Sequence, residues 1–136
     1  GSVAGSGGKC LTPFFSVAAD PAHYSIGDII CVPGLRGRQV NVPNRGQITH
    51  TGCLIVGDKG AAIKGENRFD FFTGTVAAGR QNSFADFQDK NSCNNRFSVV
   101  RAGSSEWASK MNEIDAAWNR GTSSGQMIAR YRGGAQ

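Results

Sequence analysis

Two carboxylates flank a short loop of small residues near the middle of the chain. Asp58 follows an apolar run at 53–56, and Asp70 stands between Phe69 and Phe71. Aspartate is a poor strand former and is rarely buried without a partner. Because successive side chains of a strand face opposite ways, we expect the two phenylalanines to pack inside and Asp70 to be displayed outside. Partial burial beside Phe72 on that face would raise the pKa of Asp70, as a general acid needs, whereas Arg68 would lower it.

Each of these residues also has a plainer interpretation. Arg68 falls on the same face of the expected strand as Asp70, so the two side chains could form a surface ion pair of small energetic value. Asp58 ends a strand, where turn-capping aspartates are common, and Asp20 in "AADP" most simply bonds to its own turn. Lys64 could reach a hydroxyl or a carboxylate, although most single lysines are only solvated.

Several other kinds of site find no support in the sequence. His23 and His50 have no nearby nucleophile in a triad-like pattern. The aspartates lack the dense oxygen ligands of a calcium loop, so we expect neither a metal nor a cofactor. The net charge of +5 fits an anionic polymer such as nucleic acid or bacterial wall, and equally a plain basic surface. No aromatic and basic platform for nucleic acid appears, and no apolar run is long enough to span a membrane.

The cysteines predict an oxidising compartment. The chain has 4 cysteines, at positions 10, 31, 53 and 93, and none are spaced as a zinc knuckle. We therefore expect at least one disulfide, with the pairing left open. The alternative is free buried thiols, because "IICV" and "GCLIV" resemble core strands.

Short strands dominate the expected elements. The polar and apolar pattern predicts strands within 14–21, 28–32, 36–47, 48–58, 68–72 and 96–102. The segment 48–58 is the strongest of these, and we expect Gly57 to stop it. Residues 1–9 are typical of a flexible linker or cloning remnant.

The pattern changes after residue 102. Apolar residues at Trp107, Met111, Ile114 and Trp118 form one helical face. We expect Ser104 or Ser105 to cap this helix, Gly121 to end it, and the tail to be weakly structured or to dock through three apolar side chains. These three are Met127, Ile128 and Tyr131. The prediction is an all-β domain over 10–102 with a C-terminal helical extension over 103–136.

Three stretches of the chain resemble a known family. They are "LTPFFSVAADPAHYSIGDIICVPG", "LIVGDKGAAIKGENRFDFFTG" and "RFSVV", which together run from about Leu11 to Val100. They are similar to the three-aspartate domain of membrane-bound lytic transglycosylase A. This resemblance implies a six-stranded double-psi β-barrel, related in shape to expansins. It also implies cleavage of peptidoglycan between N-acetylmuramic acid and N-acetylglucosamine.

The resemblance assigns roles residue by residue. Asp70 would be the single catalytic acid and then base, and Asp58 would support it through hydrogen bonds. Asp20 would be the third family aspartate, nearer the barrel frame. Lys64 and Gly65 fall on the family's "IKG" element. With Asp20, these two residues, Lys59 and Arg68 form our predicted set of substrate-binding residues.

The expected activity is therefore that of a lytic transglycosylase that leaves 1,6-anhydromuramoyl ends. Its partners would be peptidoglycan glycan strands, without nucleic acid and without a membrane span. It would act in the periplasm or after secretion, as the toxic domain of an antibacterial effector that an immunity protein could inhibit. Two alternatives stay open: a non-catalytic, expansin-like wall-binding barrel, and a glycoside hydrolase that uses Asp70 with Asp58.

Overall fold

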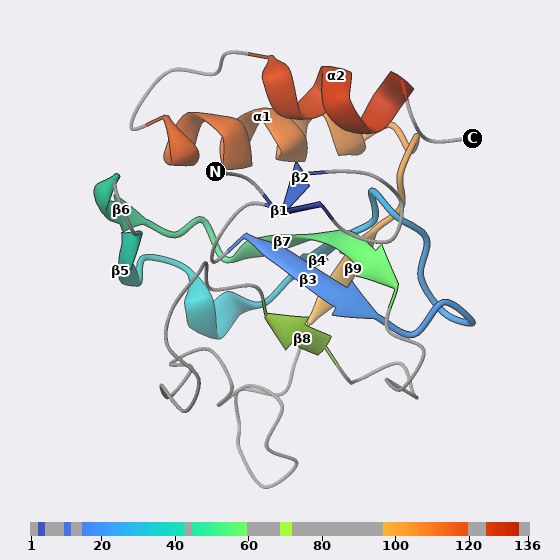
Figure 1. Ribbon diagram of the computed structural model, residues 1–136, viewed down its shortest axis with the longest axis horizontal. Helices are drawn as coiled ribbons and strands as arrows, with labels where there is room; N and C mark the ends of the chain where they lie inside the picture. The colour runs from blue at the N-terminus through green and yellow to red at the C-terminus, as the bar shows by residue number, and fades with distance from the viewer. Residues whose placement is uncertain are drawn as a thin grey trace, which may run out of the picture.

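The protein is built from short strands followed by two helices (Figure 1). The computed structural model describes residues 3–4, 10–11, 15–42, 45–59, 69–71, 97–119 and 125–133. In Figure 1 both helices lie along one side of the sheet, and β8 lies at the opposite side.

The main sheet has five strands in the order β8-β3-β7-β4-β9. At its centre, β3 (Ser16–Ala19) and β7 (Cys53–Lys59) run parallel. On one side β4 (Ile29–Cys31) is antiparallel to β7, and β9 (Ser98–Val100) is antiparallel to β4. On the other side β8 (Phe69–Phe71) is antiparallel to β3.

Two smaller pairs accompany this sheet. The hairpin of β5 (Gln39–Val42) and β6 (Gly46–Thr49) follows η1 (Pro33–Leu35), a short 3-10 turn. Near the N-terminus β1 (Val3–Ala4) pairs with β2 (Cys10–Leu11). The described strands thus confirm a mostly β chain with helix at its C-terminal end. They do not close into a six-stranded barrel, because within the described ranges the main sheet is open and ends at β8 and β9.

The predicted helix is present as α1 (Trp107–Trp118). Of its predicted face, Trp107, Met111 and Ile114 are buried, and Trp118 is partly buried. The predicted serine cap is wrong. The N-cap residue is Glu106, which makes no side-chain cap bond. Ser104 contributes only its backbone carbonyl, which accepts a hydrogen bond from the Trp107 amide at 3.1 Å. The helix ends at Trp118, before the predicted stop at Gly121, which lies outside the described residues.

The tail forms a second helix, α2 (Gln126–Gly133), which packs against α1. Met127 and Tyr131 are 3% and 2% exposed, and Ile128 is partly buried against the same core. The prediction that the tail docks through these three residues is therefore confirmed, and the docked segment is a helix.

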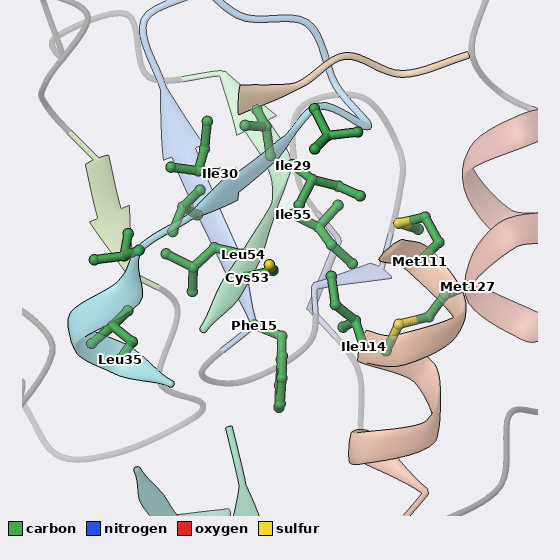
Figure 2. Close-up of a cluster of buried hydrophobic side chains, with 14 of the residues drawn as sticks. Phe15, Ile29, Ile30, Leu35, Cys53, Leu54, Ile55, Met111, Ile114 and Met127 are labelled. Carbon is green, nitrogen blue, oxygen red and sulfur yellow. The ribbon is translucent and has the colours of Figure 1, made fainter. Parts of the chain in front are cut away.

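The core lies on both faces of the central strands (Figure 2). Ile29 pairs across the sheet with Ile55, and Figure 2 shows both on the side of Met111 and Ile114 from α1. The neighbouring pair of Ile30 and Leu54 lies on the other side, toward η1. All four strand residues are 0% exposed. Each such side chain contributes about 1.5–3 kcal/mol on burial, which makes these two strands the rigid centre of the fold.

The segment predicted as one strand over 48–58 is two strands separated by a bend at His50 and Gly52. Gly52 has a φ of +94°, and a Cβ there would lie 3.1 Å from the Val32 carbonyl oxygen. The Gly52 amide donates to Nδ1 of His50 at 2.8 Å, and the buried imidazole stacks on Phe15 with ring centroids 4.2 Å apart. His50 is therefore a structural residue of the bend. Gly57, the predicted stop, lies inside β7.

A disulfide joins the two central antiparallel strands. Cys31 on β4 and Cys53 on β7 are directly paired in the sheet and are bonded to each other. The prediction of at least one disulfide is confirmed, and the sequence could not have given its pairing. The side chains of Cys10 and Cys93 lie outside the described residues.

Replacing both Cys31 and Cys53 by serine is expected to lower the free energy of unfolding by about 3 kcal/mol, because the crosslink restricts the unfolded chain. The closed loop spans 22 residues. Urea denaturation of the double variant, compared with the oxidised parent, measures the difference. A change below about 1 kcal/mol would contradict the expectation.

Candidate active site

A β-bulge sets the position of Asp58 in the sheet. Val17 on β3 is opposite Val56 on β7, but the next residue, Ala18, is opposite Asp58. Gly57 is therefore the extra residue of β7, and glycine in a strand commonly marks a bulge. The bulge moves Asp58 back by one position, from the level of Ala19 to the level of Ala18.

The strand on the other side of β3 brings Asp70 to the same level. In the antiparallel pairing of β3 with β8, Ala18 is opposite Asp70. Asp58, Ala18 and Asp70 thus form one row across three adjacent strands, which we call the aspartate row. Because neighbouring strands lie about 4.8 Å apart, the Cα atoms of the two aspartates are roughly 9.5 Å apart.

Asp20 lies at the same edge of the sheet but has a different local role. It follows β3 directly, and its carboxylate accepts a hydrogen bond from the Ala22 amide at 2.9 Å. Its backbone carbonyl accepts from the amides of His23 and Tyr24, both at 3.0 Å. The residue is only 4% exposed, so the expectation that Asp20 holds its own turn is confirmed. Contact of Asp20 with a substrate stays a prediction.

For the other predicted site residues, the structure describes only the backbone or does not describe the residue, except for Asp58. Asp58 is half-buried, and Lys59 pairs through its backbone with Ala19 at the end of β7. The side chains of Lys59 and Asp70 lie outside the described residues, as do Lys64, Gly65 and Arg68. The choice between a displayed acid and an Arg68–Asp70 ion pair therefore stays open, as does the inward packing predicted for the rings that flank Asp70.

Over the described ranges, no three histidine, cysteine or acidic side chains gather as a metal site. Within those same ranges, no helix combines the length and apolar character that crossing a bilayer requires.

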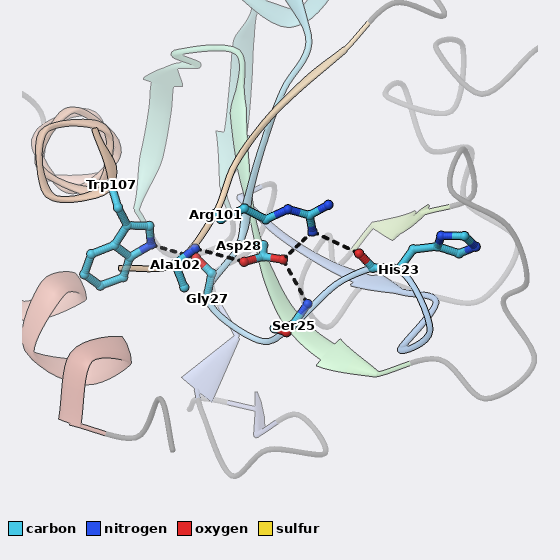
Figure 3. A network of polar contacts seen from close by, with 7 residues as sticks. All are labelled: His23, Ser25, Gly27, Asp28, Arg101, Ala102 and Trp107. Atoms are coloured by element: carbon cyan, nitrogen blue, oxygen red, sulfur yellow. Dashed lines mark hydrogen bonds and ion pairs between the residues drawn. The ribbon is translucent and has the colours of Figure 1, made fainter. Parts of the chain in front are cut away.

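A buried aspartate whose role sequence reasoning missed, Asp28, anchors the segment that follows β9 to the turn before β4 (Figure 3). Oδ1 of Asp28 accepts a hydrogen bond from the Ala102 amide at 2.9 Å. Oδ2 accepts from the Ser25 amide and from Nη1 of Arg101, both at 2.9 Å. The Asp28 side chain is 3% exposed and that of Arg101 is 58% exposed. A charged residue directly before the apolar run "IICV" was the only sequence signal, because two of its three partners are 73 and 74 residues away.

Two further contacts extend this network to the site. Nε1 of Trp107 donates to the Gly27 carbonyl at 2.8 Å, which fixes the start of α1 to the turn before β4. Nη1 of Arg101 also donates to the His23 carbonyl at 2.9 Å, and its guanidinium lies 5.4 Å from the ring centroid of Tyr24. The loop after β3, which begins at Asp20, is thereby held to β9 and α1.

A second junction ties the β5–β6 hairpin to the other end of α1. Nη2 of Arg45 donates to the Trp118 carbonyl at 2.8 Å, and the guanidinium lies 4.3 Å from the Trp118 ring centroid. Both ends of α1 are thus attached to the β region by polar contacts.

Comparison with known proteins places the aspartates in one family. A family model for the 3D domain matches residues 15–83. No curated protein and no solved structure gives a significant match. The matched segment contains Asp20, Asp58 and Asp70, and it ends before β9 and the helices. The order of these aspartates along β3, β7 and β8, together with this match over half of the chain, shows that the chain belongs to the 3D domain family.

Proposed function

We propose that the protein is a peptidoglycan lytic transglycosylase that cleaves the bond between N-acetylmuramic acid and N-acetylglucosamine. The observation that carries this proposal is the aspartate row, in which two family aspartates share one level of the sheet on either side of Ala18. The 3D domain match supports it, because this domain occurs in cell-wall enzymes of the lytic transglycosylase A type.

The reaction needs one group that gives a proton and takes one back. Protonated Asp70 donates to the glycosidic oxygen while the bond from that oxygen to C1 of N-acetylmuramic acid breaks. The 6-hydroxyl of the same sugar then adds to C1, and the Asp70 carboxylate takes the hydroxyl proton. The product is a 1,6-anhydro end, no water is consumed, and Asp70 returns to its starting state. Half-buried Asp58 would hold the sugar or Asp70 by hydrogen bonds.

A second candidate function is hydrolysis by two carboxylates, which the spacing of the row favours. Inverting glycosidases hold their carboxyl groups about 6.5–9.5 Å apart, with room for a water molecule. Two aspartates on Cα atoms roughly 9.5 Å apart are compatible with that separation. A third outcome, wall binding without cleavage, corresponds to an expansin-like role.

Purified peptidoglycan treated with the protein is expected to release muropeptides with anhydro ends. These are lighter by one water than the hydrolytic products, and borohydride does not reduce them, so mass spectrometry before and after reduction separates the two chemistries. Reducible ends would establish the hydrolase instead. Binding to insoluble wall without release would support the expansin-like role, and the absence of both binding and release would contradict all three.

We place this activity in the periplasm or outside the cell, as part of an antibacterial effector that an immunity protein inhibits. The Cys31–Cys53 disulfide supports an oxidising compartment. The net charge of +5 supports attraction to an anionic wall polymer.

A further inference from the structure

We infer that Ala18 is a substrate-contacting residue, and that its small side chain leaves room for a sugar between the two aspartates. This inference rests on the proposed action on peptidoglycan. It concerns the middle of the aspartate row, a position to which neither the family motif nor the chemistry of the acids assigns a role.

The register places Ala18 between the acids. It is the only residue of β3 that pairs with an aspartate on each side, Asp58 on β7 and Asp70 on β8. Any ligand that lies across the row from one aspartate to the other must therefore pass over the β3 backbone at Ala18.

Burial separates Ala18 from its neighbours on the same strand. Val17 and Ala19 are each 1% exposed, whereas Ala18 is half-buried. Because strand residues alternate between faces, Ala18 belongs to the face opposite Val17 and Ala19. Ser16 shares the face of Ala18 and is 0% exposed, so this face of β3 is covered at Ser16 and becomes accessible at Ala18.

The residue type is unusual for this position. Alanine is depleted in strands, where a half-buried site on a central strand commonly carries a β-branched or aromatic side chain. A larger side chain at position 18 would rise between the two aspartates and fill the space that a sugar ring needs. We therefore attribute the alanine to ligand access, with the methyl group packing against the apolar face of the ring.

The bulge at Gly57 supports the same conclusion. In regular pairing Gly57 would be opposite Ala18 and Asp58 would be opposite Ala19, which is 1% exposed. A bulge re-aims side chains in this way next to active sites. The pairing of β3 with β7 is thus irregular only at Gly57, and this irregularity places Asp58 opposite Ala18.

The test is binding to insoluble peptidoglycan by co-sedimentation, in an Asp70→Asn background so that the wall stays intact. Adding Ala18→Leu is expected to weaken binding by more than tenfold, and Ala18→Leu alone should lower the rate of muropeptide release on the order of a hundredfold. The matched control is Ser98→Leu, an exposed position on β9 of the same sheet, which should bind as the background does. Thermal unfolding verifies that each variant is folded.

The outcomes separate this inference from the proposed function. If the parent releases muropeptides and folded Ala18→Leu does so equally fast, the role of Ala18 is refuted and the transglycosylase stands. Should Ala18→Leu fail to fold, Ala18→Val takes its place, with a smaller loss of binding expected and full binding refuting the role. If the parent protein neither binds nor cleaves the wall, both statements fail together.

Discussion

Asp70→Asn is expected to reduce the release of anhydromuropeptides by about a thousandfold, because general acid–base catalysis contributes roughly 10²–10⁴ and this mechanism uses one residue for both steps. The amide keeps the shape of the carboxyl group but neither gives nor takes the proton. The measurement is the initial rate of release from purified peptidoglycan, quantified by chromatography and mass spectrometry. Binding to insoluble wall should be retained.

Asp58→Asn is the matched comparison for this variant. A residue that only supports the site by hydrogen bonds should cost less activity than Asp70, whereas the two-carboxylate hydrolase predicts comparable losses at both positions. An Asp70→Asn protein that degrades peptidoglycan as fast as the parent would falsify the single-acid mechanism.

Asp28→Asn is expected to lower the free energy of unfolding by roughly 3 kcal/mol, because a buried acceptor loses its charge and the hydrogen bonds to one of its oxygens. The carboxylate accepts hydrogen bonds from two backbone amides and from Arg101. An asparagine would direct its NH2 group at one of these donors, which leaves that donor and the new NH2 unsatisfied. Thermal unfolding should show a midpoint lower by about 10 °C.

The control for Asp28 is another acidic residue with a basic partner. Glu113 lies 3.5 Å from Lys110 on the surface of α1, and its side chain is 50% exposed. Exposed pairs contribute little, so Glu113→Gln should unfold within about 0.5 kcal/mol of the parent. Equal stability of the Asp28 and Glu113 variants would show that the buried network does not anchor the fold.

The sequence predicted the elements whose pattern is local. The apolar spacing from Trp107 to Trp118 predicted the helix and the face that it buries, although the predicted serine cap was wrong. The strand before Asp20 and its turn were predicted from the Asp-Pro pair, and the structure shows the expected bond from the Ala22 amide. In each case the residues that determine the structure lie within a few positions of one another.

Features that depend on distant partners were not predictable in this way. Gly57 was expected to end its strand, because a glycine in a strand looks the same from sequence whether it stops pairing or forms a bulge. The role of Asp28 depends on Arg101 and Ala102, which lie 73 and 74 residues later in the chain.

The aspartate row combines both kinds of information. The family resemblance pointed to Asp58 and Asp70, but their shared level depends on how β7 and β8 pair with β3. The level of Asp58 depends on the extra residue Gly57 in β7, and the level of Asp70 depends on the register of β8 against β3. Lys64, Gly65 and Arg68 keep their predicted roles as predictions, because they lie outside the described residues.

The attachment of α1 gives the protein a built-in optical reporter. The chain has 2 tryptophans, Trp107 and Trp118, and both lie on α1 at its junctions with the β region. Intrinsic tryptophan fluorescence will therefore report detachment of this helix from the β region. It will not report changes in the aspartate row. A substitution in the aspartate row that leaves the tryptophan emission spectrum unchanged therefore affects catalysis or binding without displacing α1 from the β region.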